Sequence, residues 1–263
     1  MSLTPFSVLL SRIQASEGAA MLEVPEDWLQ GRTLFGGLQA VIGLAAMRTL
    51  VPQTPLRSLQ VTFLAPVPGG PVRAAALILR SGKNTAHVEA RIVDGENTLA
   101  LMIGIFGTAR PSEVALRPRQ PAVASGTAIE LPWIPGALPN FTQHFKARWI
   151  AGAPPRSGVA SAESVIELAM RDQGKATEYH VVAMADFIPP IALSWLKAMV
   201  PAASLSWMLE LLPEEVGSLP LEGWRIDAQM TAANGGYTHQ SLMLWGPGGV
   251  PVALGRQTMV VFG

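Results

Sequence analysis

The sequence predicts an α+β protein made of two similar halves, each with a long apolar helix covered by an antiparallel β-sheet. Three observations support this fold class. Two apolar segments have helical spacing, and each is followed by a run of β-forming residues. A proline-rich stretch separates the two sets of elements. Residues also recur between the halves at a constant offset, which indicates an internal duplication.

The composition excludes several classes of protein. The chain has 263 residues, of which 49% are hydrophobic and 14% charged, and its 19 basic and 19 acidic residues give a formal charge of zero. A neutral chain lacks the positive field that attracts nucleic acid, so we expect no such partner. Because the chain has no cysteine, disulfides, thiolate metal ligands and a cysteine nucleophile are excluded.

The high apolar content raises the question of a membrane. No run of about 18 apolar residues occurs, so we expect no membrane span. The amino terminus, MSLTPFSVLLSR, has no basic segment before its short apolar run, so we expect no signal peptide and a cytoplasmic location. The excess of apolar residues predicts a homodimer or larger homo-oligomer, or an apolar ligand channel.

The elements follow the same order in each half. Apolar spacing predicts a helix over 35–52, followed by a strand near Ser58. The second half repeats the pattern with a helix over 184–201 and a strand that opens at Ser204. Both helical segments end in Val-Pro, and both strands open with Ser-Leu.

Further strands are predicted over 81–107 and 234–263, with hairpin turns at DGEN and GPGG. A helix that is apolar on nearly all sides must be buried, and a long antiparallel sheet wrapped around it gives the hot-dog arrangement. The sequence therefore predicts a tandem (double) hot-dog, with domains at 1–108 and 141–263 and a Pro-rich linker at 109–140. A two-domain α+β protein with an ordinary helix on each sheet is the alternative.

These elements resemble those of the acyl-CoA thioesterase II (TesB-like) family of double hot-dog proteins. Five segments carry the resemblance: GRTLFGGLQA (31–40), RSLQVTFLAP (57–66), MADFIPP (184–190), ASLSW (203–207) and VALGRQT (252–258). The resemblance implies hydrolysis of an acyl-CoA to a free acid and coenzyme A, without metal or cofactor. The candidate substrate-binding residues are Phe35, Gly36, Gly37 and Ser58.

The resemblance also implies a catalytic set of Asp186, Ser204 and Gln257, which together orient the hydrolytic water. A carboxylate, a hydroxyl and an amide suffice for this chemistry, because a thiolate leaves without a strong general acid. Two departures change the wall of the pocket. Ser206-Trp207 stands where the family commonly has Asp-His, and Thr258-Met259 where it often has Glu-Gly. The acyl preference of other members therefore does not transfer.

Each catalytic candidate also has a structural interpretation. Asp186 is a good helix N-cap, Gln257 suits a hydrogen-bonded core amide, and Ser204 suits a turn. In the first half, the positions equivalent to Asp186 and Gln257 are Gly37 and Gly104. We therefore expect one working site per chain and a degenerate pseudo-site.

Other candidates carry less weight. The four histidines lack metal-binding spacing and are interpreted as solvated strand or loop residues. Arg32, Arg57, Arg80 and Lys83 are candidates for contact with the phosphates of coenzyme A, or else solvated surface residues. Two alternative functions stay open. One is a non-catalytic acyl-CoA or acyl-group binding protein; the other is a hot-dog hydratase or dehydratase, which needs a histidine beside a helix-start carboxylate.

Overall fold

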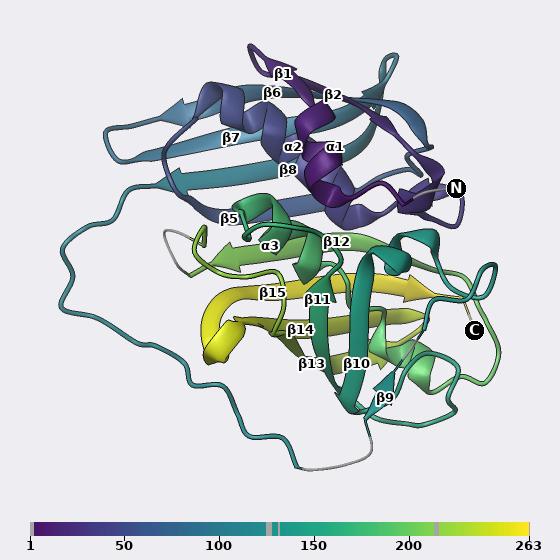
Figure 1. Cartoon of the computed structure of the whole chain (residues 1–263). Coiled ribbons are helices and arrows are strands. Elements are labelled where there is room, and N and C mark those ends of the chain that lie inside the picture. The colour runs from purple at the N-terminus through teal and green to yellow at the C-terminus, as the bar shows by residue number, and fades with distance from the viewer. Residues whose placement is uncertain (1–2, 125–127, 131, 213–215, 263) are drawn as a thin grey trace.

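One antiparallel sheet of thirteen strands runs through both halves of the computed structural model (Figure 1), which describes residues 3–124, 128–130, 132–212 and 216–262. Its strand order is β1-β2-β6-β7-β8-β5-β12-β15-β14-β13-β11-β10-β9, and β3 and β4 form a separate pair. Outward from the junction of β5 with β12, the two sides of the sheet use corresponding strands of each half. The strand order confirms the predicted duplication.

The first half contributes β1 (Gln14–Ser16), β2 (Ala19–Val24), β3 (Leu29–Gln30), β4 (Thr33–Leu34), β5 (Leu56–Phe63), β6 (Gly70–Ser81), β7 (Thr85–Asp94) and β8 (Asn97–Gly107). The remainder contributes β9 (Ile129–Glu130), β10 (Phe145–Ala151), β11 (Glu163–Met170), β12 (Ala202–Leu211), β13 (Trp224–Asn234), β14 (Tyr237–Gly246) and β15 (Val250–Val261). The helices are α1 (Phe6–Arg12), α2 (Gly36–Leu50) and α3 (Glu178–Ala185), with 3₁₀ turns η1 (Glu26–Trp28), η2 (Asn140–His144), η3 (Ile191–Ser194) and η4 (Pro247–Gly249).

Helix α2 is the buried helix that the sequence predicts in the first half. Every residue from Gly37 to Met47 is buried, which explains why no side of this segment is polar. The helix packs against β2, β6, β7 and β8 of its own half and against α3 of the other. Its amino terminus therefore lies inside the protein, close to the second half.

The predicted helix over 184–201 is wrong. Helix α3 begins earlier, where Thr177 and His180 form a capping box, and it ends at Ala185. Pro189 and Pro190 follow, and proline cannot supply the N–H groups that a continuing helix needs. Asp186 consequently lies at the C-terminal end of α3 and is not a helix N-cap.

The two halves share one core. β5 and β12 pair in antiparallel register, with Val61 opposite Trp207. Helices α2 and α3 pack together, and Arg48 of α2 forms an ion pair with Glu178 of α3. At the amino terminus, the backbone and hydroxyl groups of Ser7 both donate to the carboxylate of Asp172.

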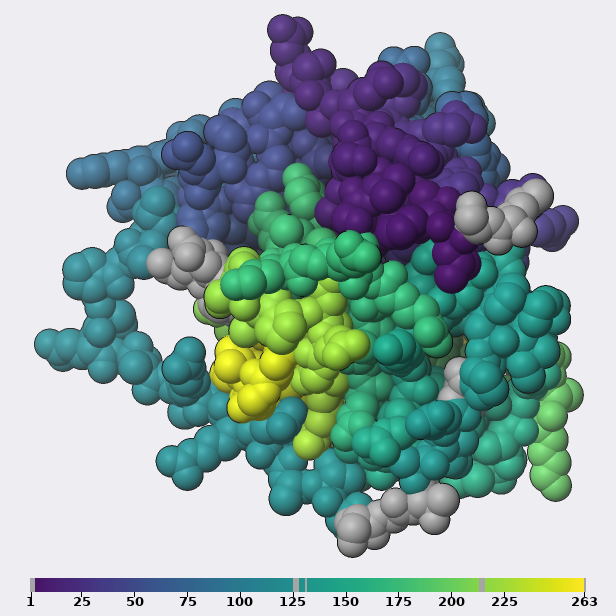
Figure 2. Space-filling model, in the orientation of Figure 1, coloured from purple at the N-terminus to yellow at the C-terminus, as the bar shows by residue number. Residues whose placement is uncertain are grey.

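The described residues of the segment between the halves run over the outside of the molecule, as the space-filling view shows (Figure 2). Its described residues are mostly without regular structure, in agreement with the proline-rich composition. Strand β9 is an exception, because Ile129 and Glu130 pair with Trp149 and Arg148 of β10. Within the described ranges, no helix is long and apolar enough to cross a membrane.

Candidate active site

Asp186 and Gln257 meet although they lie far apart in sequence. The Nε2 atom of Gln257 on β15 donates to Oδ1 of Asp186 over 2.8 Å. Gln257 is buried, and its strand face is shared with buried Ala253, Gly255 and Met259, as the alternation of the sequence predicts. The structure thus brings together two of the three candidate catalytic side chains.

The amino terminus of α2 forms the other side of the site. The backbone N–H of Gly37 donates to the carboxylate of Asp186. A Cβ atom at Gly36 would lie 2.6 Å from Oδ2 of Asp186 and 3.1 Å from the ring of Phe63. Glycine is therefore required at Gly36 by a close approach. The site is built from both halves, since the carboxylate follows α3 while the facing helix end belongs to α2.

Gln240 is a site residue that the sequence analysis missed. Its Nε2 donates to Oε1 of Gln257 over 2.9 Å, and its own Oε1 accepts from the backbone N–H of Ile191 over 3.0 Å. Because the backbone N–H of Ile191 can only donate, it fixes the orientation of the Gln240 amide. The Gln240 amide in turn fixes the orientation of the Gln257 amide. Gln257 is consequently held with its NH₂ group toward Asp186. Gln257 is both a hydrogen-bonded core amide and a contact of the Asp186 carboxylate.

Burial raises the pKa of Asp186 to about 7. Desolvation of the charged form is the main cause, and the hydrogen bonds from Gly37 and Gln257 act in the opposite direction. As a whole residue Asp186 is half-buried, so part of its surface is accessible. A carboxyl group with a pKa near neutrality can both accept and release a proton at physiological pH.

Ser204 lies on the same face of the sheet as Gln257. It pairs with Met259, two residues beyond Gln257 on β15, next to an irregularity in the pairing of β12. It is half-buried, and among the described residues no hydrogen bond joins it to Asp186 or Gln257. Ser58 is placed differently. It lies beside Glu210 on the opposite face of the sheet from Val61, so the structure does not bring it to Asp186.

Phe35 is fully buried next to the site. Its ring stacks on Phe141 of the second half, with ring centroids 4.0 Å apart. Phe145 and Phe187 extend this cluster, and Phe187 directly follows Asp186. The aromatic cluster therefore holds the start of α2 against the loop that carries Asp186.

Gly104 is the position of the first half that corresponds to Gln257. A Cβ atom at Gly104 would lie 2.6 Å from the sulfur of Met47 and 2.9 Å from the ring of Phe106. Core side chains occupy the space that an amide would need there. That the first half carries a degenerate pseudo-site stays a prediction.

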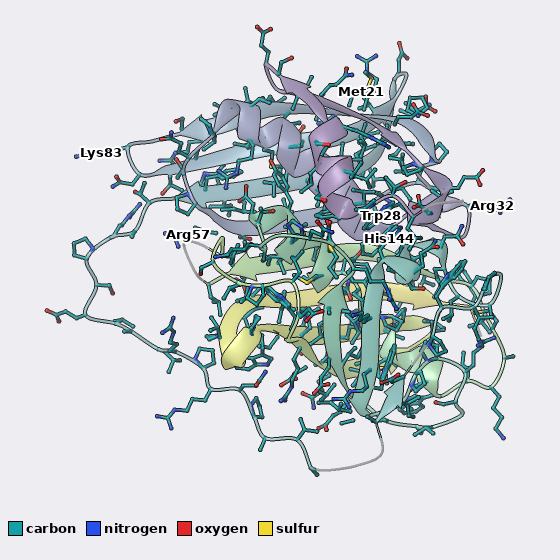
Figure 3. All side chains as sticks on the ribbon, viewed as in Figure 1. Met21, Trp28, Arg32, Arg57, Lys83 and His144 are labelled. Atoms are coloured by element: carbon teal, nitrogen blue, oxygen red, sulfur yellow. The ribbon has the colours of Figure 1, made fainter. Side chains whose placement is uncertain are left out.

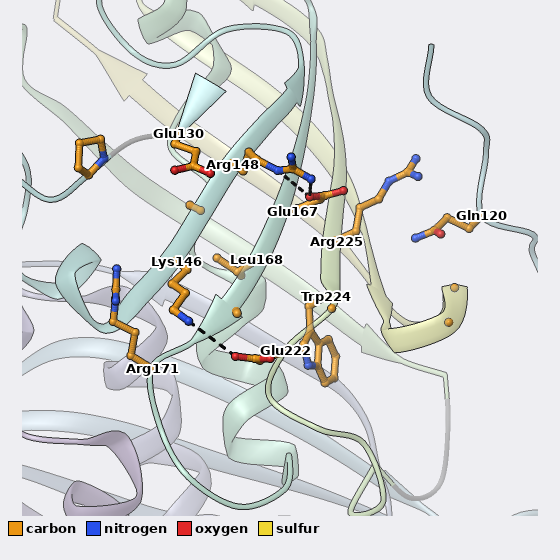
Figure 4. Close-up of a pocket in the computed structure, with 16 residues that line it drawn as sticks. Gln120, Glu130, Lys146, Arg148, Glu167, Leu168, Arg171, Glu222, Trp224 and Arg225 are labelled. Atoms are coloured by element: carbon orange, nitrogen blue, oxygen red, sulfur yellow. Dashed lines mark hydrogen bonds and ion pairs between the residues drawn. The ribbon is translucent and has the colours of Figure 1, made fainter. Parts of the chain in front are cut away.

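A charged groove of about 800 Å³ lies elsewhere, over β10, β11 and β13 (Figure 4). Lys146 faces Glu222 across it, and Arg148 is paired with Glu167. Along β11 buried residues alternate with more exposed ones, and the buried residues, such as Ile166, point to the core and not into the groove. The groove is therefore on the outer side of the sheet and is separate from Asp186.

The basic residues proposed for coenzyme A phosphates are not gathered at one place. Figure 3 shows Arg32 at one side of the molecule and Arg57 and Lys83 at the other. The guanidinium of Arg57 donates to the backbone oxygen of Gly107. Arg32 therefore does not lie beside Arg57 and Lys83.

The interpretation of all four histidines as solvated is wrong for two of them. His144 is buried and stacks on Trp28, with ring centroids 4.0 Å apart, and Figure 3 labels the two residues near each other. His180 is buried as well, and its Nδ1 accepts the backbone N–H of Thr177. Both serve packing and capping where the halves meet.

Sequence comparison identifies the class of protein that this fold and site define. Residues 24–107 match the acyl-CoA thioesterase N-terminal domain, and residues 116–261 match the acyl-CoA thioesterase C-terminal domain. The chain belongs to the acyl-CoA thioesterase family and is a thioester hydrolase with a tandem hot-dog fold. Among curated proteins, no sequence matches this chain.

Solved structures show the same fold along the whole chain. A hot-dog-fold protein from Alicyclobacillus acidocaldarius has a TM-score of 0.86 at 19% identity and covers 99% of each chain. The tesB protein of Mycobacterium avium subsp. paratuberculosis has a TM-score of 0.79 at 16% identity, covering 99% of this chain and 100% of that one. Acyl-CoA thioesterase II TesB2 from Mycobacterium marinum has a TM-score of 0.71 at 18% identity, covering 95% of each.

Proposed function

We propose that this chain hydrolyses an acyl-CoA thioester at Asp186, using a water molecule oriented by Gln257 and Ser204. The observation that carries the proposal is the 2.8 Å hydrogen bond from Gln257 to Asp186 at the amino terminus of α2. This hydrogen bond joins the Asp186 carboxylate, whose pKa is raised, to the Gln257 amide, whose orientation Gln240 fixes. Ser204, on the same sheet face, is the third group available to a water.

In the proposed reaction, the ionised carboxylate of Asp186 removes a proton as the water oxygen attacks the thioester carbonyl carbon. A carbon–oxygen bond forms, and the carbonyl oxygen becomes an oxyanion. When this intermediate collapses, the carbon–sulfur bond breaks and coenzyme A leaves as a thiolate. The proton held by Asp186 then passes to the thiolate, which leaves a free acid, a thiol and the original carboxylate.

The amino terminus of α2 is the proposed site for the oxyanion. The amides of Leu38 and Gln39 already donate to the backbone oxygen of Phe35, and that of Gly37 donates to Asp186. Within the described chain, the N–H of Gly36 has no hydrogen-bond partner. It is therefore available to a developing negative charge, which the partial positive charge of the helix end also favours.

A panel of acyl-CoA substrates, followed by thiol release, tests this proposal. Asp186→Asn removes the proton acceptor and is expected to lower kcat/KM by about 10²- to 10⁴-fold. Asp94→Asn, at an exposed hairpin turn, is the matched control and should leave the rate unchanged. Wild-type turnover that persists in Asp186→Asn rules out the assigned base. If wild type binds acyl-CoA but hydrolyses no chain length, a binding protein is favoured.

A further inference from the structure

Trp207 carries a buried hydrogen-bond donor that the described chain does not satisfy. The residue is 2% exposed, and its indole Nε1 has no hydrogen-bond partner. The Nε1 atom of Trp133 shares this state, but four other tryptophans donate the same N–H to protein oxygens: Trp28 to Thr4, Trp195 to Ser161, Trp224 to Pro220 and Trp245 to Asp227. Native proteins seldom leave a buried donor unpaired, so the indole of Trp207 calls for an explanation.

The sheet register places Trp207 beside the candidate active site. It lies directly opposite Gln257 on one neighbouring strand and opposite Val61 on the other. Paired residues project to the same face of a sheet, so Trp207 shares the face on which Gln257 contacts Asp186. Phe63, two residues after Val61, lies against Gly36 at the start of α2. Strand β12 thus carries Trp207 between two strands that both reach the site.

The neighbouring protein groups leave the indole without an acceptor. Val61 is apolar, and the indole N–H of Trp207 reaches neither the amide oxygen of Gln257 nor the carboxylate of Asp186 in the described chain. A bound molecule that brings an acceptor would pair the indole N–H and so remove the energetic cost of leaving it buried without a partner. The buried wall beside Asp186 is also where an acyl group must lie if its thioester is to reach the carboxylate.

We infer that Trp207 is a substrate-binding residue whose indole N–H donates to an oxygen atom of the bound acyl group. This inference rests on the proposed function of Asp186. Two oxygens share the required chemistry: the thioester carbonyl oxygen, and an oxygen substituent further along the acyl chain, as in a 3-oxo or 3-hydroxyacyl group. Either one pairs the buried donor, and the substituent would also make the site discriminate against acyl groups that lack it.

The substitution Trp207→Phe tests the donor, because it removes the N–H and keeps an aromatic ring. Deleting an unpaired buried donor should leave thermal stability unchanged or raise it. Activity should fall at the same time, by about tenfold in kcat/KM. Trp224→Phe is the matched control, since Trp224 is also buried but its N–H is already bonded to Pro220. That variant should lose stability while its folded fraction keeps the wild-type selectivity.

Plain acyl-CoA and 3-oxo or 3-hydroxyacyl-CoA of equal chain length separate the two oxygens. A loss that is equal on both assigns the N–H to the thioester carbonyl, and a loss confined to the oxygenated substrates assigns it to the substituent. If Trp207→Phe keeps wild-type kcat/KM on every substrate, the inference is overturned. It is also overturned if the variant loses stability as Trp224→Phe does and its folded fraction keeps wild-type kcat/KM.

Binding to an inactive form keeps this test independent of the reaction. Calorimetry of Asp186→Asn with the same acyl-CoA molecules, with and without Trp207→Phe, measures affinity in the absence of turnover. A weaker affinity in the double variant, by about tenfold, supports the donor role even if wild type hydrolyses none of them. Equal affinities in the single and double variants count against the role of Trp207 while leaving the proposed hydrolysis untouched.

Discussion

The Nε2 atom of Gln257 donates to Oδ1 of Asp186 over 2.8 Å and thereby ties the last strand of the sheet to the residue that follows α3. The same carboxylate accepts the backbone N–H of Gly37 in the first half of the chain. The candidate site depends on the packing of both halves, because neither half alone supplies the carboxylate and the facing helix end.

The pH dependence of hydrolysis should report the ionisation of Asp186. Its pKa is about 7, and the proposed base works only when ionised. We therefore expect kcat/KM to fall about tenfold per pH unit below 7 and to level off above it. Gln257→Ala removes a hydrogen bond that favours the ionised form, so its midpoint should move to higher pH. A profile that stays flat between pH 5 and 9 would contradict this assignment.

Asp186 should also make stability depend on pH in a defined direction. Its pKa rises from 3.8 in the unfolded chain to about 7 in the folded one, so folding favours the protonated form. Wild type therefore loses stability as pH rises through this range, by at most about 4 kcal/mol. Asp186→Asn does not titrate at this position and keeps its stability over the same range. The free energy of unfolding of the variant minus that of wild type should therefore increase from pH 4 to pH 8. Urea titrations at both pH values measure this, and a constant difference is the opposing result.

Gly36→Ala should remove activity by displacing the carboxylate. The new methyl group would lie 2.6 Å from Oδ2 of Asp186 and press on Phe63. We expect a loss of at least about 10²-fold in kcat/KM, because a small misplacement of the reacting groups has effects of this size. Gly217→Ala is the control, since its methyl group meets nothing within 4 Å. Equal activity of the two variants would show that the close approach has no functional role.

The sequence predicted those parts of the fold that depend on local pattern. The apolar segment of α2, the strands beginning near Ser58 and Ser204, and the hairpins all have periodic or turn signals. The position of Asp186 relative to its helix was predicted wrongly, because the capping box uses His180 where glutamate or glutamine is usual. A signal was available in Pro189-Pro190, which disfavours a helix through that segment.

Parts of the site that depend on register were beyond sequence reasoning. Gln240 meets Gln257 only because β14 and β15 pair with these two residues opposite each other. Ser58 was a candidate substrate-binding residue. However, β5 has an irregularity between Leu56 and Ser58, and Ser58 faces away from Val61. A shift of one residue in a strand moves a side chain to the other face of the sheet, and no local pattern fixes that shift.

His180 should weaken the protein at acid pH. Burial lowers its pKa from 6.5 to about 4, so the unfolded chain binds a proton that the folded chain does not. Stability is fully present above pH 6.5 and falls by about 3 kcal/mol as the pH drops toward 4. His180→Gln keeps a capping side chain that does not titrate. The stability that this variant loses between pH 6.5 and pH 4 should therefore be smaller than the wild-type loss by about 3 kcal/mol. Urea denaturation at pH 7 and pH 4.5 measures the difference; parallel losses in both proteins would exclude His180 as the cause.

Self-association is expected at the open edge of β6. This strand pairs with β2 only from Gly70 to Ala75, and among the described residues no strand covers that edge further along. Leu77, Ile78 and Leu79 follow there and are 51%, 43% and 52% exposed. An uncovered apolar edge is a ready site for pairing with a second copy of the chain.

Sedimentation equilibrium at micromolar concentration tests this expectation. Wild type should be dimeric or larger, and the double substitution Leu77→Lys with Leu79→Lys should shift it toward monomer, because charged edge residues oppose strand pairing. Leu116→Lys is the matched control, since Leu116 is 93% exposed but lies in the segment between the halves. If wild type is monomeric, self-association at the apolar edge of β6 does not explain why the chain has so few charged residues. A dimer that survives both lysines would place the interface on another surface.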